Sequence, residues 1–485
     1  MGDYSFIWDN RLFSFIFLED VRLKIFKTYT TKQIFNLLVI SGLLLIENID
    51  GNILNIAIPQ MSHTFGTSVF ILKLAITSYL VGLAVFIPIS GWFADRFGTQ
   101  KTLIASIIIF TLMSLQCGLT NSLPLLVVSR LLQGIAGAFM VPVARLLLLK
   151  IFDNSQIMKE YSVMNKFVIL GTICAPILGG YLVTYFSWRY IFWVNLPLGV
   201  LALVATILYV DNYSQSQQKF SLINFIVLAI FLACISFWLD ICLLPEINFI
   251  QKSALLLVAV IMGTIYINLE FKSELPVINF NLFKLRTFNI CFFAGIFARA
   301  ALGGRSFLLA IFLEMNFHLS AFQAGFYFIY MSLGVLSSRS LVKLIISKYG
   351  FRKTVTLANS GSSLAFLMLS GITKINIWLY CVLYISGVFS AVQFNCFNVL
   401  CYADVAEEDY SGATSLITTM QQLGASFGIV IASGLFQLFS HNLILGNYVH
   451  SFNYTFIGLA LINLFAQLFT RKLTSYDGNS LIHKT

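Results

Sequence analysis

Two acidic side chains, Glu47 and Asp50, stand in an apolar stretch near the start of the chain. They are three residues apart, so a helix would present both on one face. Two carboxylates this close repel each other when both are ionised, which suits one of them to hold a proton. We therefore predict a proton-binding site at these residues. A purely structural role for Asp50 in helix packing is the alternative.

A second candidate group surrounds Arg130 in the apolar stretch 123–150. Gln133, Gly134 and Gly137 follow it at i+3, i+4 and i+7, which is one face of a helix. A guanidinium in hydrocarbon costs roughly 2.5–3.5 kcal/mol on insertion scales, so Arg130 must face a watery cavity or a partner. A charge with glycines beside it is typical of the wall of a transport pathway. An arginine that only bridges backbone carbonyls is the alternative.

Further polar residues in apolar stretches are candidates for a substrate pathway. Arg145 follows Arg130 by about 22 Å along a helix, which places it near the inner mouth, where snorkelling is the alternative. Arg299 and Arg305 are six residues apart and do not quite share a face. An arginine-bearing cavity would favour an anionic or zwitterionic substrate over a lipophilic cation. We assign to the pathway Asn55, Gln133, Gly134, Arg145, Arg299 and Arg305.

The elements that position these residues must be membrane helices. The chain has 485 residues, of which 58% are hydrophobic and 10% charged, and its mean hydropathy is +0.87. Soluble domains are near 25% charged, so a soluble protein is excluded. Stretches of about twenty residues, enough to cross a bilayer, are predicted at 34–58, 70–92, 101–119, 123–148, 161–184, 190–210, 220–243, 252–270, 288–314, 321–346, 354–372, 377–401, 413–439 and 453–470.

Loop charge predicts the orientation of the chain. Most loop Lys and Arg residues fall in segments on one side, and the other side carries Arg189, Lys252 and Lys374. The positive-inside rule then places both termini in the cytoplasm, in a multi-pass protein of the inner (plasma) membrane. The net charge of +10 reflects this orientation and does not indicate nucleic-acid binding. Asp240 lies near the end of its apolar stretch and is expected to be solvated.

A weak internal repeat predicts the domain organisation. GWFADRFGTQKT (91–102) resembles LIISKYGFRKT (344–354), with Gly98 aligned to Gly350 252 residues later. Residues 13–26 mix aromatic and basic side chains, which favours an interfacial helix, with a disordered tail as the alternative. We predict a cytoplasmic segment 1–33, a six-helix bundle 34–210, two extra helices with flanking loops 211–287, a second six-helix bundle 288–470 and a cytoplasmic tail 471–485.

The first copy of the repeat is a candidate gating loop. Gly91 would let two helices approach, and Gly98 permits a left-handed turn of the backbone. Asp95 can cap a helix or pair across the loop, while Arg96 and Lys101 anchor it on the cytoplasmic side. A plain basic hairpin is the alternative. The loop resembles the signature Gly-x-x-x-Asp-Arg-x-Gly-x-x-Lys of the major facilitator superfamily, in which it latches one of two access states.

Residues 171–180 form a second motif. Pro176 removes a helix hydrogen bond and kinks the helix, while Gly171, Gly179 and Gly180 give it a close-packing face. The stretch resembles the antiporter motif of the same superfamily. It departs from that motif at Ala175, where the family usually has glycine.

Three further stretches narrow the resemblance. Residues 49–59 resemble the first-helix signature Leu-Asp-x-Thr-Ile-Val-Asn-x-Ala-Leu-Pro of fourteen-span drug:proton antiporters of the EmrB/QacA type. SWRYIFWVNLPLG (187–199) resembles their entry to the sixth helix. Arg130 with Gly134, Gly137 and Ala138 resembles the fourth-helix motif, whose arginine is tied to proton coupling in the family.

The resemblance implies an all-α polytopic membrane protein with the major facilitator fold: two six-helix bundles plus two inserted helices, fourteen in all. The expected function is secondary transport by alternating access, as proton-coupled efflux of a drug-like amphiphile or organic anion. The expected partners are the small-molecule substrate, protons and the lipid bilayer, and the chain is expected to be a monomer. No catalytic triad, nucleotide loop or metal cluster occurs, so we expect no enzyme activity, cofactor or metal. A proton-linked importer or uniporter of a small metabolite, and a membrane sensor or scaffold, are the alternatives.

Overall fold

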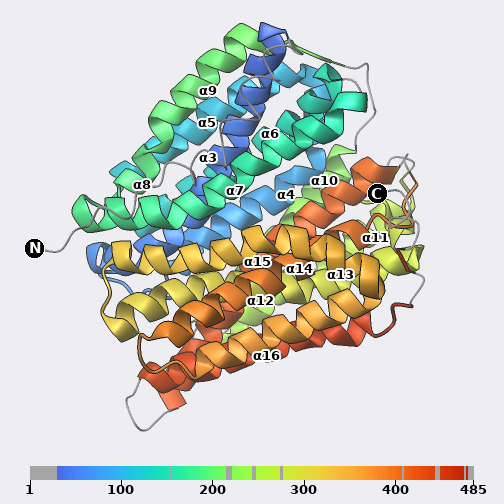
Figure 1. Ribbon diagram of the computed structural model, residues 1–485. Coiled ribbons are helices and arrows are strands. Elements are labelled where there is room, and N and C mark those ends of the chain that lie inside the picture. Colours follow the sequence, from blue (N-terminus) through green and yellow to red (C-terminus); the bar gives the residue numbers. More distant parts are fainter. Residues whose placement is uncertain are drawn as a thin grey trace, which may run out of the picture.

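A computed structural model of the chain describes residues 30–152, 154–214, 221–242, 247–273, 277–406, 409–442, 448–474 and 477–478. Every regular element formed by these residues is a helix (Figure 1). The predicted interfacial helix at residues 13–26 lies outside the described part of the chain.

The first half of the molecule contains six membrane-spanning segments, and the last of them is divided into α8 and α9. Its helices are α3 (Thr31–Phe65), α4 (Lys73–Phe97), α5 (Thr99–Leu119), α6 (Leu123–Ile151), α7 (Asn154–Tyr185), α8 (Tyr190–Trp193) and α9 (Asn195–Tyr209). The predicted spans match these helices closely, because each is set by a run of apolar residues long enough to cross a bilayer.

Two inserted helices and a second half follow. The inserted helices, here called the hairpin, are α10 (Leu222–Cys242) and α11 (Phe249–Phe271). The second half contains η1 (Phe280–Lys284), α12 (Arg286–Phe317), α13 (Ala321–Ser370), α14 (Ile377–Leu400), α15 (Tyr410–Asn442) and α16 (Tyr448–Thr470). The 50-residue α13 joins two helices across Gly350, whose φ of 73° and ψ of 169° interrupt the helix. Among the described residues, twelve other helices are long and apolar enough to cross a membrane, so the two spans predicted in α13 make fourteen, as expected.

The two halves meet at one end of the molecule and separate at the other. We call the end that carries Gly98 and Gly350 the basic end. At the opposite end one apolar core joins both halves, and there the ring of Phe70 stacks on Phe436 at 4.4 Å and lies 6.4 Å from Phe307.

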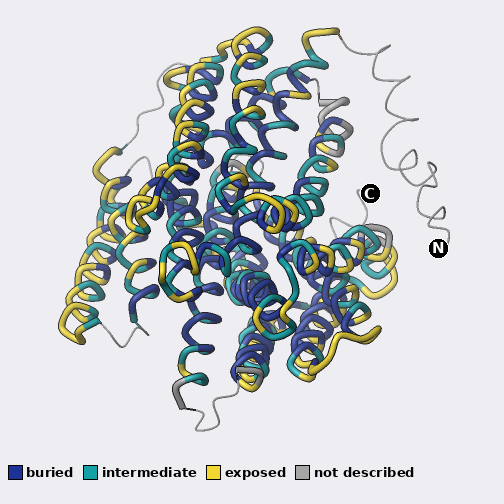
Figure 2. Tube along the Cα trace, turned by 90° about the vertical axis from the view of Figure 1, so that its left-hand side faces the viewer, coloured by how far each residue is buried: buried dark blue, intermediate teal, exposed yellow. Residues whose placement is uncertain are grey.

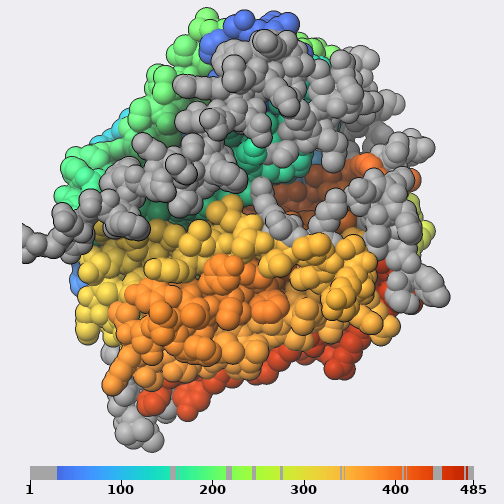
Figure 3. All heavy atoms as spheres, in the orientation of Figure 1, coloured from blue at the N-terminus to red at the C-terminus, as the bar shows by residue number. Residues whose placement is uncertain are grey.

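Toward the basic end the halves have separate apolar cores. Leu103 and Leu147 belong to the core of the first half, while Val355 and Leu400 belong to the core of the second. In Figure 1 the helices of the halves lie together at the left and diverge toward the right. Figure 3 shows the first half, blue to green, above the second half, yellow to red.

The hairpin packs against helices of both halves. Its α10 contacts α4 of the first half and α15 of the second. A fourth apolar core lies here, in which Phe225 packs against Phe86 at a ring distance of 5.4 Å. The hairpin leaves many apolar side chains of α11 exposed, whereas buried stretches fill the interior of the molecule (Figure 2). This is the pattern expected of a lipid-facing element.

The prediction that Asp240 would be solvated is wrong. Its side chain is 4% exposed, and its Oδ2 accepts a hydrogen bond of 3.0 Å from Thr77. The ammonium of Lys73, also buried, lies 3.9 Å from Asp240 Oδ1 and donates to the Asp240 carbonyl at 3.2 Å. The sequence alone could not reveal that α10 would pack against α4 and cover this acid.

Candidate functional site

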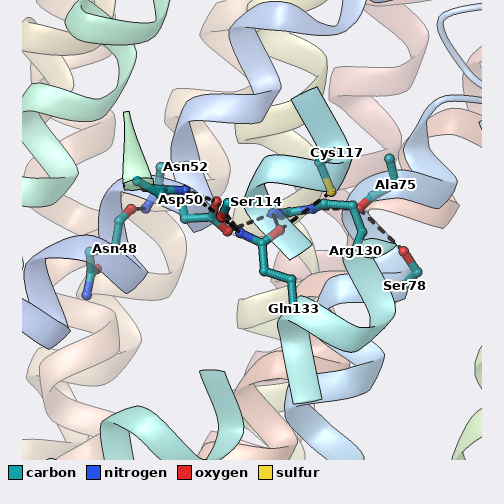
Figure 4. A network of polar contacts seen from close by, with 10 residues as sticks. Asn48, Asp50, Asn52, Ala75, Ser78, Ser114, Cys117, Arg130 and Gln133 are labelled. Carbon is teal, nitrogen blue, oxygen red and sulfur yellow. Dashed lines mark hydrogen bonds and ion pairs between the residues drawn. The ribbon is translucent and has the colours of Figure 1, made fainter. Parts of the chain in front are cut away.

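Asp50 and Arg130 form a buried ion pair in the first half. The Nη1 atom of Arg130 on α6 donates to Asp50 Oδ2 on α3 at 2.6 Å, and each side chain is 1% exposed (Figure 4). The predicted requirement that Arg130 face a cavity or a partner is met by a partner. A buried pair of this kind is strongly destabilised when one member is removed, because the other charge is left uncompensated.

Amide and hydroxyl groups complete the surroundings of the Asp50 carboxylate. Its Oδ1 accepts hydrogen bonds from Gln133 Nε2 at 2.9 Å and from Asn195 Nδ2 at 2.8 Å. Gln133 also donates to Ser114 Oγ at 2.7 Å and accepts from Arg130 at 2.8 Å. We call these five residues the acid–base network. The network joins α3, α5, α6 and α9, so its rearrangement would change the packing of most helices of the first half.

Ser114 and Asn195 are members of this network that were not assigned to the site from sequence. Both are neutral side chains in apolar helices, so charge gave no signal for either. Asn195 does lie in the 187–199 motif, whose resemblance to the sixth-helix entry could have identified it. Ser114 had no comparable signal.

Arg130 also contacts residues of α4, in addition to its ion pair with Asp50. Its Nε donates to the Ala75 carbonyl of α4 at 3.2 Å, and its guanidinium lies 4.2 Å from the centre of the Tyr79 ring. Its Nη2 is buried with no hydrogen-bond partner among the described residues. The close-approach role of Gly134 is seen beside it, because a β-carbon there would collide with the Tyr79 carbonyl. Helix α6 therefore supplies both the buried charge of Arg130 and, at Gly134, the small residue that allows α4 to pack closely.

Glu47 lies apart from the acid–base network. It is partly buried, and Asn48 donates to its Oε2 at 3.2 Å. Electrostatic interactions connect it to Arg145 of α6, to Asp50, and to Arg299 of α12. The predicted neighbours Glu47 and Asp50 thus share a region but have different partners. The charges of Arg145 and Arg299, one from each half of the molecule, thus act on Glu47.

Arg305 and Asn55 occupy separate positions. Arg305 is buried and donates to Ser390 Oγ at 2.9 Å and to Ser386, both on α14. Its guanidinium also lies 5.5 Å from the Phe366 ring. Asn55 donates to the backbone of its own helix at 3.5 Å. The guanidinium of Arg299 lies instead 5.2 Å from the Phe394 ring, so the two arginines have different partners.

A neutral amide cluster lies in the second half. Gln393 Nε2 donates to Asn359 Oδ1 at 2.6 Å and to Asn463 Oδ1 at 2.9 Å. Asn463 in turn donates to Ser363 Oγ at 2.8 Å. All four residues are buried, and they join α13, α14 and α16. This cluster was not predicted, because its members carry no charge and match none of the motifs.

The loop between α4 and α5 differs partly from its prediction. Gly98 has a φ of 95°, as predicted for a left-handed turn. A β-carbon on Gly91 would meet nothing within 4 Å, so the predicted close approach of helices there is wrong in this conformation. Lys101 is exposed, and Arg96 stacks over Trp92 at 5.5 Å. Among the described residues, Asp95 forms no ion pair with the second half.

A strap at residues 211–213 holds this loop instead. Thr99 donates from its backbone to the Tyr213 carbonyl at 3.0 Å, and its hydroxyl donates to the Asp211 carbonyl at 3.2 Å. Lys32 of α3 pairs with the Asp211 carboxylate at 2.6 Å. The strap therefore gives the Thr99 hydroxyl a structural role, both as a donor to Asp211 and as an acceptor from the Tyr213 backbone.

The antiporter-like helix α7 contacts both halves through its small residues. A β-carbon at Gly171 would lie 3.0 Å from Asn48, and one at Gly179 would lie 2.6 Å from Ile53, both on α3. A β-carbon at Gly180 would collide with the backbone of α13 at Ala321. The carbonyl of Pro176 likewise lies against Gly325 of α13. This face closes the molecule at the end opposite the basic loops.

Comparisons with known proteins agree with this architecture. A sequence model of the Major Facilitator Superfamily matches residues 40–429 and 291–475. The MdtD protein of Citrobacter koseri, whose name refers to multidrug resistance, is 30% identical over 445 residues, which cover 90% of this chain and 94% of MdtD. MdtD of Escherichia coli O9:H4 is 31% identical over 422 residues, covering 86% and 89%.

Solved transporter structures share the fold. A D-xylose–proton symporter superimposes with a TM-score of 0.66 at 14% identity, covering 93% of this chain and all of that one. A POT family transporter gives a TM-score of 0.66 at 16% identity, with coverage of 90% and 96%. The helices, the sequence relatives and the family match all support one assignment: this chain belongs to the Major Facilitator Superfamily and is a secondary transporter.

Proposed function

We propose that this protein exports a small amphiphile or organic anion in exchange for protons. The observation that carries the proposal is the buried ion pair of Asp50 and Arg130 within the acid–base network. Ionisable residues inside a membrane protein commonly mark ion or substrate pathways. This pair lies on helices of one half only, so a change in its protonation can act on the packing of that half.

The contacts of the pair supply a coupling mechanism. Protonation of Asp50 would remove the charge that Arg130 balances, and the guanidinium would then be free to move. Arg130 also binds the backbone of α4 at Ala75, so its movement would shift α4 relative to α3 and α6. Because α4 contacts α15, such a shift would reach the interface between the halves. Alternating access requires a link of this kind.

Glu47 is our candidate for the substrate-linked proton site. Arg145 and Arg299, which belong to different halves, interact electrostatically with Glu47, so a substrate anion could compete with Glu47 for these arginines. The arrangement favours anionic or zwitterionic substrates. The names of the relatives point instead to drugs, and the substrate panel below therefore includes cations.

The orientation of the chain completes the proposal. Most loop Lys and Arg residues lie at the basic end, which we place in the cytoplasm together with both termini. The halves share an apolar core at the opposite end and have separate cores at the basic end. The conformation described here is then closed to the outside and divided on the cytoplasmic side, as expected of an exporter ready to load substrate.

The test is proton flux in proteoliposomes that contain a trapped pH-sensitive dye. A pH gradient is imposed, and its dissipation is followed while amphiphilic cations and small organic anions are added one at a time. Asp50→Asn, Arg130→Ala and Glu47→Gln are compared with Asp211→Asn, a matched variant in which an exposed acid is neutralised. We expect substrate-dependent flux that is lost in Asp50→Asn and Arg130→Ala and kept in Asp211→Asn.

Other outcomes would select a different function. Flux that survives both Asp50→Asn and Arg130→Ala contradicts the proposed site. Substrate uptake that persists with Arg130 neutralised indicates a proton-linked importer or a uniporter. Folded protein without flux or counterflow for any compound, together with a normal cellular phenotype in both variants, indicates a sensor or scaffold.

A further inference from the structure

An apolar cavity lies between the hairpin and the two halves, outside the acid–base network. Its volume is about 290 Å³. The hairpin lines it with Phe231 and Gly263, α4 with Pro88, and α15 with Thr419 and Leu423. It is nearly twice the size of an engineered 150 Å³ cavity that binds benzene. A hydrocarbon larger than one ring therefore fits.

One polar group points to the kind of ligand. Thr419 is 6% exposed, and its hydroxyl has no hydrogen-bond partner among the described residues. The nearby Tyr266 hydroxyl is already used, since it donates to Glu270 at 2.9 Å. A water molecule needs two to four polar partners, and an almost wholly apolar wall does not supply them. An apolar ligand with a single polar atom would satisfy Thr419.

The cavity approaches the interior of the second half through Met420. This side chain lines the cavity and also a smaller one of about 20 Å³, whose wall contains Arg299 and Gln393. Methionine is flexible and adapts to irregular spaces, so Met420 can act as a movable partition. A hydrocarbon held beside the hairpin would thus be one side chain away from the arginine that interacts with Glu47.

We propose that this cavity is a lateral binding site for an alkyl or aryl chain that bears one hydrogen-bond acceptor for Thr419. The chain comes either from a membrane phospholipid or from an amphiphilic compound that enters from the bilayer. The cavity wall includes residues of both halves, so an occupant binds most tightly to one relative position of α4 and α15. Its occupancy therefore biases the equilibrium between access states.

The experiment is photolabelling of the full-length protein in nanodiscs, with the labelled peptides mapped by mass spectrometry. One arm uses a phosphatidylethanolamine with a diazirine in its acyl chain, and the other a diazirine-bearing dodecanol, whose hydroxyl oxygen can accept a hydrogen bond. We expect saturable labelling of α11 and α15 peptides that line the cavity. Excess unlabelled dodecyl compound displaces the lipid label if the amphiphile is the occupant, and leaves it unchanged if the lipid is.

Variants separate the cavity from the lipid-facing surface. Thr419→Phe fills the cavity and should lower specific labelling roughly tenfold, as expected for a loss of about 1.4 kcal/mol. Thr419→Val keeps the volume but removes the hydroxyl, and roughly fivefold weaker binding is expected from one lost hydrogen bond. The controls are Ile261→Phe and Thr264→Val on α11, both at exposed positions. They should label like the parent protein.

The proposal is overturned if labelling does not saturate, or if Thr419→Phe labels as strongly as Ile261→Phe. A melting temperature for each variant shows that it is folded, and the conservative Thr419→Val provides a second test if Thr419→Phe is unstable. The readout is binding and not transport. The result is therefore independent of whether the protein moves protons.

Discussion

The two halves of the molecule share a scaffold of glycine contacts but carry different chemistry. Gly134 packs on the Tyr79 carbonyl of α4, and Gly387 packs in the same way on the Met331 carbonyl of α13. This correspondence places Ser386 where the first half has Gln133. A similar pair of contacts, Gly171 on Leu45 and Gly424 on Ile296, places Ala301 where the first half has Asp50.

The comparison separates packing from function. The first half buries a carboxylate and a guanidinium in contact, whereas the second half buries Arg305 among serine hydroxyls. The amide cluster around Gln393 joins α13, α14 and α16 and contains no charge. Close helix contacts are thus common to both halves. Among the described residues, only the first half has a buried acid–base pair between its own helices, since the buried contact of Lys73 with Asp240 joins it to the hairpin.

The largest expected effect tests this difference in charge. Arg130→Met leaves Asp50 buried without its cation and should cost about 3–5 kcal/mol of folding free energy. Arg305→Met removes a cation that has no acidic partner in the structure, so the variant should be as stable as the parent or more stable. Thermal unfolding of both purified variants measures the contrast. If Arg130→Met and Arg305→Met were equally destabilised, the two buried arginines would contribute equally to stability, and the proposed difference between the halves would be wrong.

A smaller effect is expected for the two buried glutamines. Gln133→Leu and Gln393→Leu each leave polar partners unsatisfied, at a cost of about 1–3 kcal/mol. Both variants should melt at lower temperature than the parent protein. Only Gln133→Leu should impair proton flux in proteoliposomes, since only Gln133 touches Asp50. A flux defect in Gln393→Leu would place coupling chemistry in the second half as well.

Replacing both members of the ion pair should recover part of the lost stability but not function. The double variant Asp50→Leu/Arg130→Met leaves no unpaired charge, so it should be more stable than Arg130→Met. It should still be less stable than the parent protein by about 1–3 kcal/mol, because Gln133 and Asn195 lose their acceptor on Asp50. Proton flux should nevertheless be absent. Recovery of flux in the double variant would mean that the pair is a packing device, as in the structural alternative for Asp50.

The smallest effect concerns the strap that holds the first basic loop. Lys32 and Asp211 are each about half exposed, so their ion pair should contribute less than about 1 kcal/mol. Asp211→Asn should therefore barely change the melting temperature, and raised salt should abolish any difference. Thr99→Val removes the hydrogen bond from the Thr99 hydroxyl to the Asp211 carbonyl and should lower the melting temperature more than Asp211→Asn does. A larger decrease for Asp211→Asn would show that the ion pair with Lys32 is what holds the strap.

The fold was predictable because crossing a bilayer imposes a minimum length of apolar sequence. Each spanning helix corresponds to such an apolar stretch in the sequence. The two parts of α13 were also predicted as separate spans, with Gly350 between them. Helix ends were less predictable: α3 extends beyond the predicted span 34–58 because the polar residues at its ends also remain helical. Asp50, Arg130 and Gln133 lie in contact, as expected because charge in an apolar helix demands partners, and their role in proton coupling stays a prediction.

Other parts of the site could not be predicted for a related reason. Ser114, Asn359 and Asn463 are neutral, and neutral polar residues are common enough in membrane helices to give no signal alone. Asp240 was misjudged because its burial depends on α4, which is far away in the sequence. The charges that act on Glu47 come from different halves, and the spacing of residues in the sequence does not relate them.

The buried contact of Lys73 with Asp240 has a consequence for how the protein is made. Asp240 follows Lys73 by 167 residues, so α4 enters the membrane well before its counter-ion has been synthesised. Until α10 arrives, the ammonium at the start of α4 must stay hydrated at the membrane surface, because an unpaired charge is costly in hydrocarbon. We therefore expect α4 to reach its final depth only after the hairpin has been inserted. The first half would then complete its packing only after the hairpin, which is translated later, has been inserted.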